Sequence, residues 1–155
     1  MEKSIIVENL AYRYGDLLAV DHINFDVKAG KILGFLGPNG AGKTTTVKML
    51  TGQLRPYAGK AILLGYDVTK DTNKVQSQIG VCFEQTNLYE QMSAIENLKL
   101  FAALFGVNNF DGYALLERVG LAGREKDKVS GYSKGMKQRL MIARSLVNRP
   151  QIIFM

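Results

Sequence analysis

Short apolar runs, separated by glycine, proline and polar residues, fill the first half of the chain. Runs of this length between turn-forming residues are typical of β-strands. They predict strands at residues 4–10, 23–27, 32–36, 60–64 and 79–83. A weaker, polar helix is expected at residues 73–78, directly before the last of these strands.

From about residue 86 the apolar positions follow a helical spacing instead. Ser93 and Glu96 have the spacing of a capping box, in which each side chain satisfies a free backbone N–H of the other, so a helix is expected to begin there. Its apolar stripe consists of Ile95, Leu98, Phe101, Ala102 and Phe105. Gly106 is expected to end this helix.

Two further helices and a strand complete the predicted elements. Asp111 is placed to cap a second helix, which Gly120 ends. A third helix is expected at residues 135–147, with Pro150 just beyond it. The apolar residues 152–155 then predict a final strand.

Composition indicates a folded globular chain. It has 155 residues, 46% of them hydrophobic and only three prolines, which is enough for one core. The net charge of +6 comes from basic residues spread among acidic ones, so we expect a solvated surface and no nucleic-acid partner. Cys82, the single cysteine, lies in an apolar run and is expected to be a small buried side chain.

No apolar segment has the length needed to span a bilayer, and the N-terminus lacks the apolar stretch of a signal peptide. We therefore expect a soluble, cytoplasmic chain. Any contact with a membrane is expected to come through a partner.

The most specific pattern follows the predicted strand at residues 32–36. It consists of Gly37, Pro38, Asn39, Gly40, Ala41, Gly42, Lys43 and Thr44. Two glycines separated by four residues, then lysine and a hydroxyl residue, form the phosphate-binding pattern, here between a strand and a predicted helix at residues 45–50. The alternative interpretation is a glycine-rich turn with an incidental lysine.

Each residue type has a physical reason. Gly40 and Gly42 allow the backbone to turn so that its N–H groups surround phosphate, and the following helix directs its positive end at the anion. Lys43 reaches the outer phosphates. Thr44 supplies an oxygen ligand for Mg²⁺, and Thr45 is placed to bond a phosphate oxygen nearer the sugar. Nucleotide binding with magnesium is the resulting hypothesis.

Two more segments, in a fixed order with the phosphate loop, point to a family. Gln85 follows the predicted strand at residues 79–83, and residues 133–139 read Ser-Lys-Gly-Met-Lys-Gln-Arg at a helix start. With Tyr14 ahead of the loop, the chain resembles along its whole length the nucleotide-binding subunit of an ATP-binding cassette (ABC) transporter. The resemblance implies a P-loop NTPase of the α/β class, cut short at its C-terminal end.

The resemblance also implies a subdivision of this single domain. Residues 1–85 correspond to an antiparallel β subdomain with the phosphate-loop core. Residues 86–147 correspond to a helical subdomain with the signature segment. Residues 151–155 correspond to the strand that the family calls the Walker B strand.

Roles for individual residues follow from the same resemblance. Tyr14 stacks on adenine, Val20 lies on the nucleotide-binding surface, and the phosphate loop with Thr45 holds ATP. Thr44 and Gln85 contact Mg²⁺, and Gln85 reports the nucleotide state to the transmembrane partner. The ATP held by the opposite subunit of a dimer is contacted by Ser133, Lys134, Gly135 and Met136.

The signature segment departs from the commonest form of the family. Lys134 stands where glycine is usual, and Met136 stands where glutamine is usual. This variant resembles cassettes that serve ABC-2 type export with separately encoded membrane subunits. The implied partners are a transmembrane permease and a second nucleotide-binding subunit, with the chain peripheral on the inner face of the cell membrane.

The catalytic set of the family is incomplete here. The aspartate and glutamate that follow the Walker B strand in the family have no counterpart up to Met155, and His22, in a predicted connection between strands, does not match the family's later histidine. Only Lys43 and Gln85 contribute to catalysis. We therefore expect nucleotide binding with little hydrolysis. The resemblance also implies that the final strand lies in the middle of a parallel sheet, without the strands that normally follow it. We therefore expect an exposed apolar edge that favours self-association.

Two other classes of protein share part of this pattern. A cassette ATPase that serves DNA repair, chromosome structure or the ribosome shares the phosphate loop and signature segment, but typically carries a coiled-coil insertion or a second cassette. A small GTPase or kinase shares only the phosphate loop and leaves residues 133–139 unexplained. The transported substrate is not encoded in this chain.

Overall fold

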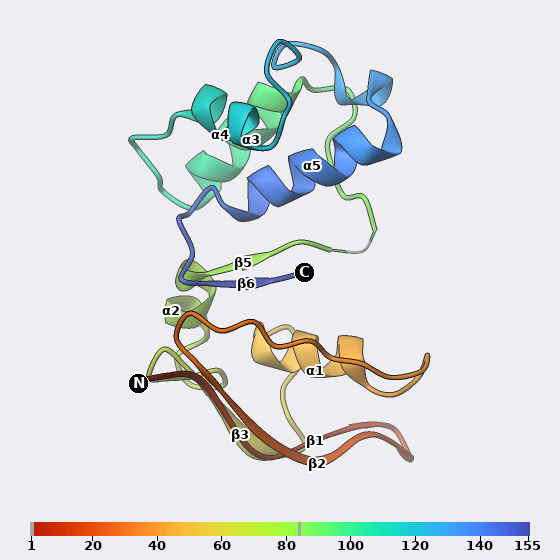
Figure 1. The fold of residues 1–155 in the computed structure, drawn as a ribbon. Helices are drawn as coiled ribbons and strands as arrows, with labels where there is room; N and C mark the ends of the chain where they lie inside the picture. The colour runs from red at the N-terminus through yellow and green to blue at the C-terminus, as the bar shows by residue number, and fades with distance from the viewer. Residues whose placement is uncertain (1, 84) are drawn as a thin grey trace. The chain divides into compact units, whose positions relative to one another are not determined.

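The computed structural model describes residues 2–83 and 85–155 and divides into two compact units, Met1–Gln76 and Ser77–Met155. Figure 1 shows the strands and helices of each unit. The predicted subdivision at residue 85 stays a prediction.

The first unit is built on an antiparallel sheet with strand order β2-β1-β3-β4. Its elements are β1 (Lys3–Tyr14), β2 (Leu17–Lys28), α1 (Lys43–Leu50), β3 (Ala58–Leu63), β4 (Tyr66–Asp67) and the start of α2 (Thr72–Gln78). Alternate residues of β1, such as Ile5 and Val7, are buried, as expected for a sheet with one covered face. The predicted antiparallel β subdomain is confirmed, with longer strands than the apolar runs alone indicated.

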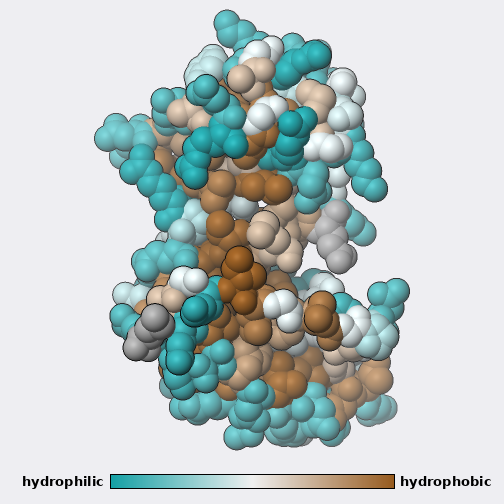
Figure 2. All heavy atoms as spheres, viewed as in Figure 1, coloured by the Kyte–Doolittle hydropathy of each residue, from teal (hydrophilic) through white to brown (hydrophobic). Residues whose placement is uncertain are grey.

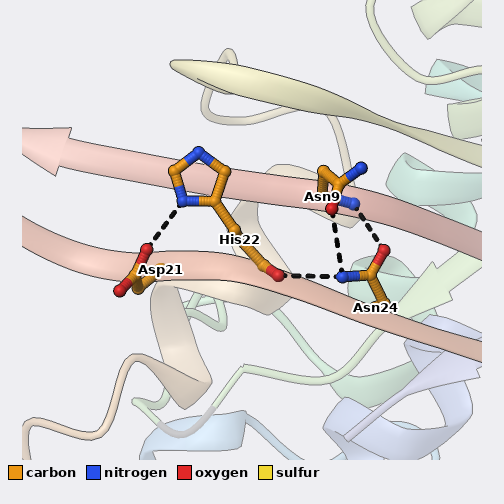
Figure 3. A network of polar contacts seen from close by, with 4 residues as sticks. All are labelled: Asn9, Asp21, His22 and Asn24. Carbon is orange, nitrogen blue, oxygen red and sulfur yellow. Dashed lines mark hydrogen bonds and ion pairs between the residues drawn. The ribbon is translucent and has the colours of Figure 1, made fainter.

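The pairing of β1 with β2 is irregular where two residues, Asn9 and His22, adopt positive φ angles of 49° and 41°. The side chain of Asn24 stabilises this irregular pairing. Its Oδ1 accepts the Asn9 N–H at 2.8 Å, and its Nδ2 donates to the His22 carbonyl at 2.9 Å (Figure 3). His22 therefore lies within β2, and its prediction as part of a connection was wrong.

The predicted strand at residues 32–36 is absent from the structure. Residues 31–38 have no strand assignment, and Ile32 and Leu36 are fully exposed. An apolar run becomes a strand only when a neighbouring strand supplies its hydrogen bonds, and the first unit's described sheet ends at β2 on one side and at β4 on the other. The prediction of a strand was wrong for this reason.

The second unit combines a two-stranded parallel sheet with a cluster of helices. Its elements are β5 (Ile79–Val81), α3 (Ala94–Leu104), α4 (Gly112–Arg118), a 3₁₀ turn η1 (Val129–Gly131), α5 (Lys134–Ser145) and β6 (Ile152–Phe154). Strands β5 and β6 pair in parallel register, as expected for the final strand. Gly80 permits β5 to approach α5, because a Cβ there would lie 2.1 Å from the Ser145 carbonyl oxygen.

The helices of the second unit share one apolar core. It contains Ala94, Ile95, Leu98, Ala102, Leu115, Leu116, Leu121, Val129, Tyr132, Leu140, Ala143 and Val147. The caps predicted at Ser93 with Glu96 and at Asp111 are confirmed. The prediction that Phe105 belongs to the apolar stripe of this helix was wrong, because Phe105 follows the last residue of α3 and is 45% exposed.

Candidate nucleotide-binding site and signature segment

The phosphate loop of the first unit is shaped by a close contact between Gly42 and β2. Gly42 has a φ of 84° and stands directly before α1. A Cβ on Gly42 would lie 2.5 Å from the Ala19 carbonyl oxygen and 3.0 Å from Val20 Cγ2. Only glycine fits both the backbone conformation and the space. The contact also brings Val20, a predicted nucleotide-binding residue, to the loop.

Lys43 folds back over the loop that precedes it. Its Nζ donates to the carbonyl oxygens of Gly37 and Pro38, at 2.7 Å each. These two bonds close the loop around the lysine and hold a positive charge at its mouth. A cation fixed by backbone carbonyls in this manner is well placed to pair with a polyphosphate.

The first turn of α1 differs from those of the other long helices. Among the residues that the structure describes, no side chain caps α1 and no acidic residue lies in its first turn. By contrast, Ser93 caps α3 and Ser133 caps α5 through their side chains. The N–H groups and the positive end of α1 are thus left for an anion from outside the chain.

Tyr14 reaches the same region from the end of β1. Its hydroxyl lies 3.4 Å from Thr45 Oγ1, although the two residues are far apart in the sequence. Tyr14 is 47% exposed, and its ring makes an edge contact with the ring of Tyr12, with ring centroids 4.8 Å apart. A half-exposed ring beside a phosphate loop offers a surface on which an adenine base can stack.

These contacts provide a test of whether the site fits ATP. Tyr14, Val20 and residues 37–45 come together in one unit, with a fixed cation, an uncapped helix start and an exposed aromatic ring. Thr44 is exposed in the first turn, where its hydroxyl is available to a metal ion. The residues present therefore fit a nucleotide with its magnesium ion.

The signature segment forms the start of α5 in the second unit. Ser133 is the N-cap, and its Oγ accepts the Met136 N–H at 3.2 Å. Lys134 and Gly135 are exposed in the first turn, and Met136 packs in part against the helical core. The predicted contact of these residues with ATP on another subunit stays a prediction.

Gln85 lies in the second unit, in the loop after β5. Gln85 is exposed. The preceding strand is extended by a bond from the Cys82 N–H to the Phe154 carbonyl at 2.8 Å. Cys82 itself is buried, as predicted, and burial raises the pKa of its thiol. Its reactivity toward thiol reagents is low for this reason.

Sequence reasoning missed two buried polar side chains that hold the loop of Gln85. Asn97 of α3 is fully buried and bonds to the backbone of Tyr89. Arg144 of α5 is 4% exposed and bonds to Asn87. The available signal was their position beside the apolar residues of each helix, where a polar side chain needs a partner.

The fold and the phosphate loop define a P-loop nucleotide-binding cassette of the α/β class. The family model described as ABC transporter matches residues 20–155. The chain belongs to the ABC transporter family, as an ATP-binding domain.

Similar proteins include ATP-binding proteins named for drug transport. The bacitracin transport ATP-binding protein BcrA of Bacillus licheniformis is 39% identical over all of this chain and 51% of its own length. The fluoroquinolones export ATP-binding protein MT2762 of Mycobacterium tuberculosis is 41% identical over 97% of this chain and 51% of its own length. The chain thus spans about half the length of these relatives.

Solved structures agree on the fold. A structure described as the ATP-binding subunit of an ABC transporter matches with a TM-score of 0.85 and 28% identity, over 96% of this chain and 64% of the other. The cbiO1 protein of Clostridium perfringens, part of the ABC transporter complex cbiONQ, matches with a TM-score of 0.85 and 25% identity, over 99% and 64%. Within the described residues, no helix is long and apolar enough to cross a membrane.

Proposed function

We propose that this chain binds ATP with Mg²⁺ at residues 37–45 and serves as the energy-coupling subunit of an exporter. The observation that carries the proposal is the start of α1, where no described side chain provides a cap and Lys43 is held across the loop by two carbonyl oxygens. The free N–H groups of α1 and the charge of Lys43 lie at the same loop, and together they favour the binding of an anion with several oxygens.

Each residue of the site has a proposed task. Lys43 neutralises the outer phosphates, and the N–H groups that follow Gly40 and Gly42 bond to phosphate oxygens. Thr44 ligates Mg²⁺, which supplies charge neutralisation when bound. Tyr14 offers its exposed ring to the adenine base, an interaction that depends on stacking rather than on hydrogen-bond pattern.

The remaining roles rest on family membership. Ser133, Lys134, Gly135 and Met136 are proposed to contact the ATP of a second cassette subunit. Gln85 is proposed as a magnesium contact that senses the nucleotide state. A transmembrane permease would hold the chain at the inner face of the membrane. Export is supported by a relative named for fluoroquinolone export. A role in transport is also supported by a relative named for bacitracin transport.

Mutation of Lys43 tests the proposal directly. ATP affinity, measured by calorimetry with MgCl₂ present, is expected to fall about 10- to 100-fold in Lys43→Ala, because a charge-assisted contact to phosphate is lost. Lys48→Ala is the matched control, since Lys48 is exposed on the same helix, and it should change affinity by less than about twofold. Equal affinity in Lys43→Ala and the unmodified chain would refute the proposed site.

Hydrolysis is a separate question. We propose that a polypeptide of these 155 residues binds ATP but turns it over slowly, because neither Lys43 nor Gln85 is a base for the attacking water. Phosphate release should stay near the rate of a Lys43→Ala sample while ATP binding is retained. Phosphate release well above that of the Lys43→Ala sample would show that another group in the chain activates the water.

A further inference from the structure

A buried arginine on α5 holds the loop that follows Gln85. Arg144 is 4% exposed, and its Nη1 donates to the Asn87 carbonyl oxygen at 2.7 Å. Its Nη2 donates to the side-chain Oδ1 of the same asparagine. The guanidinium carbon lies 4.6 Å from the ring centroid of Phe101 on α3. One side chain therefore joins two helices and the loop.

Two other contacts fix the same loop, residues 85–92. Asn97 of α3 is fully buried, accepts the Tyr89 N–H at 2.9 Å and donates to the Tyr89 carbonyl at 3.0 Å. Lys137 of α5 forms an ion pair with Glu90, with Nζ and Oε1 2.5 Å apart. The loop is thus held at three neighbouring positions by the helices on which it lies.

Burying an arginine costs free energy, which its contacts must offset. Removal from water disfavours its charged form, and burial lowers the pKa of the Arg144 guanidinium. The planar guanidinium places two donors in fixed directions, and here both meet oxygens of one residue, one on the backbone and one on the side chain. Lysine carries a single ammonium group and cannot reproduce this fork.

We propose that Arg144 is a positioning residue that fixes the loop bearing Gln85 to the helix that begins at the signature segment. Ser133 caps α5 at one end and Arg144 lies near its other end, so the helix connects both functional segments of the second unit. The role of Gln85 at magnesium rests on the proposed function. The anchoring of the loop does not.

The anchoring is tested by hydrogen–deuterium exchange without nucleotide. Arg144→Lys is expected to raise amide exchange in residues 85–92 about tenfold, while the middle of α3 and the first unit stay unchanged. Arg139→Lys is the matched control, because Arg139 lies on the same helix and bonds to one carbonyl, that of Gly120, at 2.9 Å. Arg139→Lys should leave the amide exchange of residues 85–92 unchanged.

Asn87→Ala keeps the test decisive if Arg144→Lys unfolds. Asn87 is exposed, and its replacement removes only the side-chain acceptor, so a smaller rise of about threefold in the exchange of residues 85–92 is expected. Unchanged exchange of this loop in Asn87→Ala and in a folded Arg144→Lys would overturn the proposal. If Arg144→Lys unfolds, the loop exchange of Asn87→Ala decides alone.

The link to Gln85 has a functional readout that a loss of stability alone would not mimic. The measured quantity is the factor by which Mg²⁺ raises ATP affinity. Gln85→Ala and Arg144→Lys should each reduce this factor about equally, and the double variant should reduce it no further. If the double variant instead reduced the factor by the product of the two single reductions, the link between Arg144 and Gln85 would be overturned. Absence of ATP binding in the unmodified chain would refute the proposed function, while the exchange result would still decide the role of Arg144.

Discussion

Two glycines of the phosphate loop share a backbone conformation but differ in their surroundings. Gly40 and Gly42 both have a φ of 84°. A Cβ on Gly42 would lie 2.5 Å from the Ala19 carbonyl oxygen, whereas a Cβ on Gly40 would meet nothing within 4 Å. A residue with a Cβ would therefore carry the strain of a left-handed conformation at either position, but only at position 42 would it also collide with the sheet.

Alanine at these two positions separates the two costs. Gly40→Ala is expected to lower the free energy of unfolding by about 1 kcal/mol through backbone strain alone. Gly42→Ala should lower it by about 3 kcal/mol and impair ATP binding, because β2 and the loop must move apart. Urea denaturation and ATP titration of both variants provide the measurements. Similar losses in the two variants would mean that the contact with Ala19 contributes nothing.

At the scale of elements, α3 shows how a helix start depends on ionisation. The Ser93 N–H and hydroxyl both donate to Glu96 Oε2, at 2.7 Å each, and the Glu96 N–H donates back to Ser93 Oγ at 3.3 Å. The bonds from the Ser93 backbone and side chain hold the pKa of the Glu96 carboxyl below its usual range. The charged form of Glu96 is thus the form that stabilises the helix.

This linkage predicts a pH dependence with a definite sign. Because the pKa of Glu96 is lower in the folded than in the unfolded chain, its stabilisation is present above the unfolded-state pKa and is lost as pH falls through the folded-state pKa. The stability advantage over Glu96→Gln should therefore be largest near neutral pH and should vanish in acid. Denaturation curves at several pH values measure it.

Ser93→Ala provides the control for this linkage. It removes the side-chain bond to Glu96 but keeps the bond from the backbone N–H. In the Ser93→Ala background, the pH-dependent difference in the free energy of unfolding between the chain with Glu96 and the Glu96→Gln variant should shrink without disappearing. An advantage of equal size at all pH values would show that the charge of Glu96 has no part in capping α3.

At the scale of the whole molecule, apolar side chains reach the surface among polar ones. Figure 2 shows brown patches between teal side chains on the face in view. Between β2 and α1, Ile32 and Leu36 are fully exposed, while Phe35 makes an edge contact with Phe25 of β2 at 5.3 Å between ring centroids. Adjacent exposed apolar residues favour contact with another surface.

Self-association of the chain is the expected consequence. Sedimentation velocity should show oligomers whose fraction grows with concentration and falls when Ile32→Ser is combined with Leu36→Ser. Leu17→Ser combined with Leu104→Ser is the control, because both leucines are well exposed, at 67% and 69%, but lie in other elements. A chain that sediments as a monomer at all concentrations would contradict the expectation.

Local patterns carried most of the predictions that the structure confirms. The caps at Ser93 and Asp111 and the final strand were predicted because each depends on residues a few positions apart or on a continuous apolar run. The parallel pairing of the final strand was implied by the family resemblance. The phosphate loop was equally evident, since its glycines and lysine all lie within residues 37–44. The family also followed from the sequence, through segments that occur in a characteristic order.

Only the tertiary structure decided which segments find partners. Residues 32–36 are as apolar as a strand, but the ladder that makes a strand belongs to its neighbours, and none of the described strands pairs with them. His22 joins β2 because Asn24 supports an irregular pairing with Asn9. Arg144 is buried because Asn87, 57 positions earlier, supplies its oxygens. The sequence by itself determined the phosphate loop, the helix starts and the family, whose signals are local. Long-range pairing of backbone and buried polar groups depends on distances that no local pattern encodes.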